Sequence, residues 1–283
     1  MEVILADVHG FCSGVQRAID LVEHARVKYD REIHTLGALI HNPQEVARLD
    51  KAGIKTLTDD AEVIDGVPAI RTHGAPPQTF ARLKTLGQPI VDTTCPYVKY
   101  SQHVAREFCN EGYDVIIMGD KNHPEVKGIV GYCTRPVYVI KYITDIDSLP
   151  PMEKAGIMAQ TTVNENTFLK IADILRTRIP EVKFVNTICN ATHERQESVN
   201  DLAKQVEVLY VVGGRTSSNS NKLVEVSKTF CSKTFLIETA DEINESDLNG
   251  VERVGVTAGA STPDWLIQQV VDKLKSFEPV LKF

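Results

Sequence analysis

The hydrophobic positions of this chain repeat one pattern, in which a short strand-like run leads through a polar loop into an amphipathic helix. After the first loop, apolar residues recur from Val15 at the i, i+3, i+4, i+7 spacing of a helix face. A cysteine stands at the end of the loop in all three copies of the pattern. The copies are residues 3–6 before Cys12, residues 89–92 before Cys95, and residues 182–185 before Cys189.

Two further strand-loop-helix patterns follow in each third of the chain. The first set of predicted strands is 33–36, 115–118 and 209–212, with polar loops at 41–45, 122–125 and 217–219. The second set begins at residues 69, 156 and 254, and a short strand precedes each of its members, at 54–57, 137–140 and 235–237. An interval of about ninety residues is too long for a solenoid repeat and indicates a triplicated domain.

The predicted fold class is therefore α/β, with three similar units that each hold a small parallel sheet flanked by helices. We expect the units to surround a pseudo-threefold axis, with the carboxyl edges of the sheets facing a central cavity. The predicted units are residues 1–95, 96–188 and 189–283. No glycine- or serine-rich linker marks these soft boundaries, and the N-terminal strand could pair with another unit.

Composition excludes several classes of protein. The chain has 283 residues, of which 42% are hydrophobic and 24% charged, and a formal net charge of -7. This charge and the lack of a Lys/Arg-rich run argue against nucleic-acid binding. With no apolar run of 18 residues and no leader-like N-terminus, we expect no membrane span and a cytoplasmic location.

The six cysteines fall into two groups, and none lies in a C-x-x-C pair. Cys109, Cys133 and Cys231 continue apolar stripes and are expected to be buried. Cys12, Cys95 and Cys189 each precede a helix, whose N-terminus favours a thiolate. Three thiolates could hold zinc with an added histidine, or an iron-sulfur cluster in which one iron lacks a protein ligand.

The remaining polar loops offer a set of hydrogen-bond donors at predicted helix starts. Each residue alone is most often a helix cap. Together they resemble the donors that bind phosphate, and a diphosphate would suit their number. The set is His41, His73, His123, Ser217, Ser218, Asn219 and Ser261.

Glu125 follows a His-Pro turn in one of these loops, and Thr161 lies in the last loop of the same unit. The structural interpretation of Glu125 is a first-turn glutamate that favours the helix dipole. The functional interpretation is a proton donor, with the Thr161 hydroxyl relaying or orienting the proton.

At these residues the chain resembles the 4-hydroxy-3-methylbut-2-enyl diphosphate reductases, or LytB family. The matching motifs run in order from residue 10 to residue 264 and are highly specific as a set. They include Gly10-Phe11-Cys12, His41-Asn42-Pro43, His73-Gly74, Thr94-Cys95-Pro96, Asn122-His123-Pro124-Glu125, Gln160-Thr161-Thr162, Thr187-Ile188-Cys189, Ser217-Ser218-Asn219 and Ala258-Gly259-Ala260-Ser261. Ser13 departs from the pattern, because many members have phenylalanine there.

The resemblance implies reductive removal of the allylic hydroxyl from 4-hydroxy-3-methylbut-2-enyl diphosphate, the last step of the non-mevalonate isoprenoid route. It implies a [4Fe-4S] cluster on Cys12, Cys95 and Cys189, whose fourth iron binds that hydroxyl. It also implies diphosphate binding by the seven loop donors named above, and proton handling by Glu125 and Thr161.

Two other functions fit the residues. A redox-neutral iron-sulfur dehydratase also binds a hydroxyl at an open iron, and a non-catalytic phosphate-binding module could carry structural zinc. The chain has neither a G-x-G-x-x-G fingerprint nor a P-loop. We therefore expect electrons to arrive singly, from a protein such as ferredoxin or flavodoxin.

Overall fold

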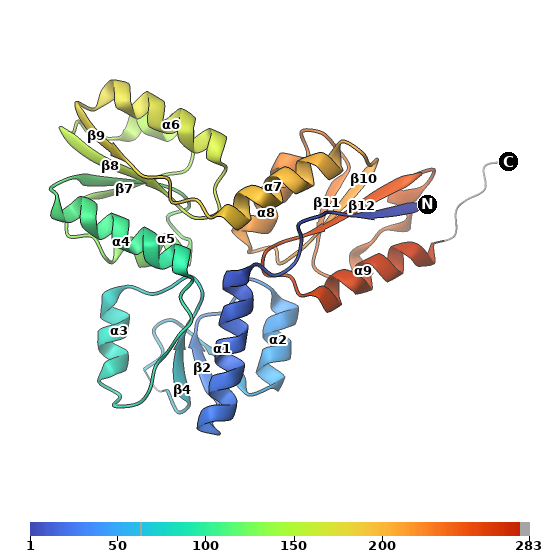
Figure 1. The fold of residues 1–283 in the computed structure, drawn as a ribbon, viewed down its shortest axis with the longest axis horizontal. Helices are drawn as coiled ribbons and strands as arrows, with labels where there is room; N and C mark the ends of the chain where they lie inside the picture. Colours follow the sequence, from blue (N-terminus) through green and yellow to red (C-terminus); the bar gives the residue numbers. More distant parts are fainter. Residues whose placement is uncertain (63, 278–283) are drawn as a thin grey trace. The chain divides into compact units, whose positions relative to one another are not determined.

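The computed structural model describes residues 1–62 and 64–277 (Figure 1). Its strands form three parallel four-stranded sheets, which confirms the α/β class and the three similar units. The sheet orders are β3-β2-β4-β5, β7-β6-β8-β9 and β11-β10-β12-β1. Each sheet has one layout: a short edge strand, two central strands, and an edge strand that leads to a cysteine.

The first sheet consists of β2 (Ile33–Leu36), β3 (Ile54–Leu57), β4 (Val67–Ile70) and β5 (Val91–Asp92). The second consists of β6 (Asp114–Met118), β7 (Val137–Ile140), β8 (Lys154–Ala159) and β9 (Glu181–Phe184). The third consists of β10 (Val208–Val212), β11 (Thr234–Ile237), β12 (Arg253–Ala258) and β1 (Glu2–Leu5). The first strand of the chain therefore completes the third sheet, where it pairs with β12.

The helices begin after these strands, as the periodicity predicts. The first third carries α1 (Ser13–Tyr29), α2 (Pro43–Lys51) and α3 (Pro77–Lys84). The second carries α4 (Pro96–Asn110), α5 (Pro124–Val130) and α6 (Glu165–Arg178), and the third α7 (Asn190–Ala203), α8 (Ser218–Ser227) and α9 (Asp264–Ser276). Short 3-10 helices are η1 (Ile143–Ser148), η2 (Ala240–Glu242) and η3 (Glu245–Leu248). No helix of the described residues is long and apolar enough to cross a membrane.

The chain divides into two compact bodies. The terminal body contains Met1–Gln16, Ile40–Lys51 and the described residues from Asn190 onward, and so includes the third sheet. The central body contains Arg17–Leu39 and Ala52–Cys189, with the first and second sheets. This division differs from three separate units, whose boundaries stay a proposal, as do the threefold axis and the central cavity.

Within each body, alternate residues of the central strands pack on opposite faces of the sheet. In β6, Ile116 lies in the cluster of α6 residues, whereas Ile117 lies in the cluster of α4 and α5 residues. In β10, Tyr210 packs with residues of α9 and Val211 with residues of α7 and α8. Because both faces are covered, β6 and β10 consist mostly of apolar residues, as expected for parallel sheets. This rigid packing fixes the loops at the carboxyl edges, where ligands of such folds bind.

Candidate functional site

The three repeated cysteines occupy equivalent places in the backbone. Helices α1, α4 and α7 each begin at the residue after a cysteine, at Ser13, Pro96 and Asn190. The N-H group of each cysteine donates a hydrogen bond to a backbone carbonyl in the adjacent loop. In each case this carbonyl belongs to the second residue after the end of the neighbouring strand. These bonds are Cys12 to Ala260 (3.1 Å), Cys95 to Thr72 (3.0 Å) and Cys189 to Thr161 (3.0 Å). The repeat thus extends to single hydrogen bonds, and it holds each cysteine against the loop of the adjacent strand.

These three side chains are half-buried. The Cys12 Sγ accepts a hydrogen bond from the Val15 N-H at 3.4 Å, which is how a helix N-terminus stabilises a thiolate. Cys109 and Cys231 are buried, as predicted, whereas Cys133 is only half-buried, contrary to the expectation. Burial, with the adjacent Cys109 thiol, raises the pKa of Cys133 to about 12. A thiol that stays protonated is a poor metal ligand, so its environment favours a packing role.

Glu125 and Thr161 form a buried pair in the central body. Glu125 is 2% exposed and lies in the first turn of α5. Its Oε1 accepts the Thr161 N-H at 2.7 Å, and its Oε2 accepts the Thr161 hydroxyl at 2.8 Å. The side chain therefore spans from the loop after β6 to the loop after β8, so both carboxyl oxygens have a defined direction.

Burial raises the pKa of Glu125 from 4.5 to about 7, against the opposing effect of the two Thr161 hydrogen bonds. Near neutral pH the group is therefore part carboxylic acid and part carboxylate. When it is protonated on Oε2, the bond to Thr161 reverses and the carboxyl group donates to the hydroxyl. Thr161 can then pass its own proton onward, so the pair has the chemistry of a proton donor with a relay.

Two of the predicted histidines lie beside each other in the same body. The rings of His73 and His123 are 5.3 Å apart and nearly perpendicular. The Nδ1 atom of His123 accepts from the Glu125 N-H at 3.2 Å, so this histidine caps α5 as the structural interpretation expects. That bond assigns the proton of the neutral ring to Nε2, which leaves an N-H donor on its far side.

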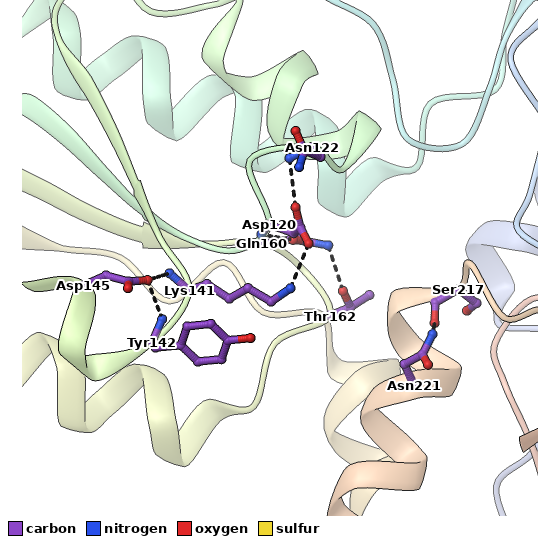
Figure 2. Close-up of polar contacts among 9 residues, drawn as sticks. All are labelled: Asp120, Asn122, Lys141, Tyr142, Asp145, Gln160, Thr162, Ser217 and Asn221. Carbon is purple, nitrogen blue, oxygen red and sulfur yellow. Dashed lines mark hydrogen bonds and ion pairs between the residues drawn. The ribbon is translucent and has the colours of Figure 1, made fainter. Parts of the chain in front are cut away.

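A buried glutamine, to which the sequence analysis assigned no role, links the loops that carry this proton-donor pair. Gln160 Oε1 accepts the Asp120 N-H at 3.0 Å, and its Nε2 donates to the Thr162 hydroxyl at 3.1 Å (Figure 2). Asp120 in turn accepts from Lys141 Nζ at 2.9 Å and from the Asn122 N-H at 2.9 Å. These bonds lower the pKa of Asp120. They fix the start of the loop that leads to His123 and Glu125.

The terminal body brings four other predicted residues onto its own loops. The Ser261 hydroxyl donates to the His41 carbonyl at 3.2 Å. That carbonyl also lies against Gly214, where a Cβ would be 2.4 Å from the oxygen. Ser217 caps α8 by accepting the Ser220 N-H at 3.2 Å. Among the described residues, the Nδ2 of Asn219 has no hydrogen-bond partner although it is buried, so it remains available to a ligand.

A second buried glutamate in this body was missed by the sequence analysis. Glu45, which is 1% exposed, accepts from Arg48 at 2.9 Å and 2.7 Å and from the Trp265 indole N-H at 3.2 Å. It therefore ties α2, which follows His41, to α9, which follows Ser261. Only their shared placement beside motif residues could have drawn attention to Glu45 and Trp265.

The comparisons with known proteins identify the chain's relatives. A family model described as LytB protein matches residues 3–275. A relative from Caldanaerobacter subterraneus, named 4-hydroxy-3-methylbut-2-enyl diphosphate reductase, is 40% identical over 98% of both chains. One of the same name from Aquifex aeolicus is 41% identical over 97% of this chain and 96% of its own.

Solved structures agree with these matches. A structure of (E)-4-hydroxy-3-methyl-but-2-enyl diphosphate reductase, described as the terminal enzyme of the non-mevalonate pathway, is 42% identical, with a TM-score of 0.71 over 98% of this chain and 100% of its own. The E-1-hydroxy-2-methyl-but-2-enyl-4-diphosphate reductase from Plasmodium falciparum is 28% identical, with a TM-score of 0.91 over 100% of this chain and 94% of its own. The repeated cysteine junctions, the fold and these full-length matches agree: the chain belongs to the LytB protein family.

Proposed function

We propose that this chain is the reductase that converts 4-hydroxy-3-methylbut-2-enyl diphosphate into isopentenyl diphosphate and dimethylallyl diphosphate. One observation carries the proposal: a cysteine stands directly before a helix at three equivalent backbone positions, in a chain related end to end to such reductases. The fold alone would not justify a function, because α/β folds serve many chemistries.

The donor set fits a [4Fe-4S] cluster held by Cys12, Cys95 and Cys189. All three are half-buried cysteines directly before helices, and iron-sulfur clusters take cysteine ligands. When bound, a cluster with three protein ligands supplies electrons and one iron open to an oxygen of the substrate. The other three cysteines are assigned to packing, which Cys133 supports through its raised pKa.

Glu125 is assigned as the acid that protonates the departing hydroxyl, and Thr161 as the hydroxyl through which the proton passes. Hydroxide is a poor leaving group, so its loss near neutral pH requires a proton donor. A carboxyl group with a pKa of about 7 remains partly protonated at that pH and can release its proton. Burial of the pair keeps bulk water from supplying the proton at random.

The diphosphate is assigned to His41, His73, His123, Ser217, Ser218, Asn219 and Ser261. Their hydroxyl, amide and imidazole groups donate hydrogen bonds to phosphate oxygens, and Ser217, Ser218 and Asn219 lie at the N-terminus of α8, where the helix dipole favours an anion. In a chain of net charge -7, such concentrated donors provide the attraction that the overall charge does not. The electron donor is assigned to an external one-electron protein such as ferredoxin or flavodoxin, and the location to the cytoplasm.

The test is turnover under anaerobic conditions with a chemically reduced one-electron donor. The reconstituted protein should convert the substrate into the two five-carbon diphosphates, whereas the matching alcohol without diphosphate should react far more slowly. An equally good reaction of the free alcohol would overturn the diphosphate assignment. A colourless, zinc-containing protein that binds the substrate without converting it would overturn the reductase assignment.

A further inference from the structure

A buried serine sits in a notch between two glycines at the carboxyl edge of the third sheet. Ser220, in the first turn of α8, is 0% exposed. A Cβ on Gly213, just after β10, would lie 2.2 Å from the Ser220 Oγ, and one on Gly259, just after β12, would lie 2.1 Å from it. The hydroxyl therefore occupies the space that a Cβ would need at either glycine position.

These two positions require glycine because space is limited there, and not because of the backbone conformation. Neither glycine has a positive φ, so an alanine would meet no backbone strain there. The Ser220 Oγ has no hydrogen-bond partner among the residues that the structure describes. A buried hydroxyl without a partner adds no hydrogen bond to offset its desolvation, so stability alone does not account for a serine there. The relevant properties of the Ser220 side chain are therefore its small size and its position between the two glycines.

Ser220 is connected to the other residues of the first turn of α8. The Ser220 N-H donates to the Ser217 hydroxyl at 3.2 Å, so the cap and the notch residue move together. From the other side, Asn221 Nδ2 donates to the Ser217 carbonyl at 2.9 Å (Figure 2). The Asn219 Nδ2 lies 3.5 Å from the place of a Cβ on Gly259. The loop donors Ser217 and Asn219 thus lie directly beside the notch.

We propose that Ser220, seated between Gly213 and Gly259, is a positioning residue that sets the place of Ser217, Ser218 and Asn219 toward the phosphate groups of the substrate. This inference rests on the diphosphate site proposed above. Ser220 does not itself touch the ligand, because it is enclosed by the two glycines. An added methyl at either glycine displaces the first turn of α8 and moves those donors together.

The two glycines differ in a way that gives a sharp test. At Gly259 the obstacle is the Ser220 Oγ, since the Ser220 Cβ lies 3.3 Å from the added Cβ, whereas at Gly213 the Ser220 Cβ itself lies at 2.9 Å. Removing the hydroxyl should therefore relieve Gly259→Ala but not Gly213→Ala. Combining Ser220→Ala with each glycine substitution in turn therefore distinguishes a steric effect at the notch from general destabilisation of the protein.

The readouts are equilibrium binding of inorganic pyrophosphate to the cluster-loaded protein, KM, kcat and iron content. Gly259→Ala should weaken pyrophosphate binding and raise KM roughly ten- to a hundredfold, as expected when a hydrogen-bond donor or two is misplaced, with kcat and iron content less affected. Gly259→Ala/Ser220→Ala should return binding to near the wild-type value, and Gly213→Ala/Ser220→Ala should stay weak. Ser227→Ala, a buried serine at the other end of α8, is the matched control and should bind normally.

Each outcome decides between the inference and the proposed function. Wild-type protein that fails to bind pyrophosphate would refute the diphosphate site itself. Wild-type binding with unchanged binding by Gly259→Ala, or with no rescue by Ser220→Ala, would refute the notch. Should Gly259→Ala not fold, Ser220→Cys serves instead, because its larger sulfur presses on both glycines. Weakened pyrophosphate binding by folded Ser220→Cys supports the inference, and unchanged binding refutes it.

Discussion

Glu125→Gln removes the acidic proton while keeping the shape of the buried pair. The glutamine oxygen can still accept the Thr161 N-H that Glu125 Oε1 accepts at 2.7 Å, and the amide can donate to the Thr161 hydroxyl. None of the hydrogen bonds that Glu125 makes with Thr161 involves a cysteine side chain, so cluster loading should stay normal. If acid catalysis is its role, turnover should fall by on the order of 10²–10⁴ with substrate still bound.

The same substitution should change stability in a direction fixed by the pKa. The pKa of Glu125 is raised from 4.5 to about 7, so the folded state holds a proton that the unfolded state has lost between these values. Wild-type stability therefore declines as pH rises from 4.5 to 7. By linkage the loss approaches roughly 3 kcal/mol at pH 8 and is under about 1 kcal/mol at pH 5. Glutamine has no charge to bury, so the variant should unfold at a higher temperature than wild type at pH 8, and this difference should shrink toward pH 5.

Three measurements on Glu125→Gln decide the matter: steady-state turnover from pH 6 to 9, cluster absorbance with and without substrate, and thermal unfolding at pH 5 and 8. Wild-type turnover should fall about tenfold per pH unit above 7, where Glu125 loses its proton, and the variant should lack this limb. Thr161→Val is the comparison, because it keeps the acid and misplaces its path, and it should lose less activity. Near wild-type turnover by Glu125→Gln would remove this residue from the mechanism, and loss of the cluster would return it to a structural role.

Four other variants test the remaining assignments. Cys189→Ser should lose iron and activity, whereas Cys133→Ser should keep its iron and lower the stability by about 1–3 kcal/mol. Iron analysis and urea unfolding measure these effects, and the reverse pattern would contradict the cysteine assignment. Ser261→Ala removes the hydroxyl that contacts the His41 carbonyl at 3.2 Å, and should weaken pyrophosphate binding roughly ten- to a hundredfold with iron unchanged. Trp265→Phe takes one donor from buried Glu45 and should lower stability by about 1–3 kcal/mol, and an unchanged urea midpoint would show that this bond contributes nothing.

The strands and helices could be predicted because each follows from the local periodicity of hydrophobic residues. Strands at 54–57 and 137–140 have the predicted bounds, and the helices begin directly after Cys12, Cys95 and Cys189. The strand before Cys95 is shorter than predicted, because pairing with β4 reaches only Val91 and Asp92. Helix α8 ends at Ser227, so Cys231, which continues an apolar stripe in the sequence, lies beyond the helix.

The packing around the site could not be predicted, because it depends on residues far apart in sequence. The contact between Glu45 and Trp265 joins segments 220 residues apart. The Ser220 notch depends on two glycines from different strands, and an isolated serine gives no sign of its depth. The raised pKa of Glu125 comes mainly from burial, which periodicity near a loop does not reveal. The sequence thus indicated the candidate groups, whereas their environment required the structure.

The most direct test of the proposed reductase is the number of electrons consumed per product formed. Anaerobic protein with the cluster loaded is mixed with 4-hydroxy-3-methylbut-2-enyl diphosphate and a measured amount of reduced one-electron donor, and the donor's absorbance and the products are followed together. Replacing the C-O bond by C-H with release of water requires two electrons, so two equivalents of donor should be oxidised for each isopentenyl or dimethylallyl diphosphate. Consumption of the substrate without oxidation of the donor would identify a redox-neutral dehydratase and contradict the account.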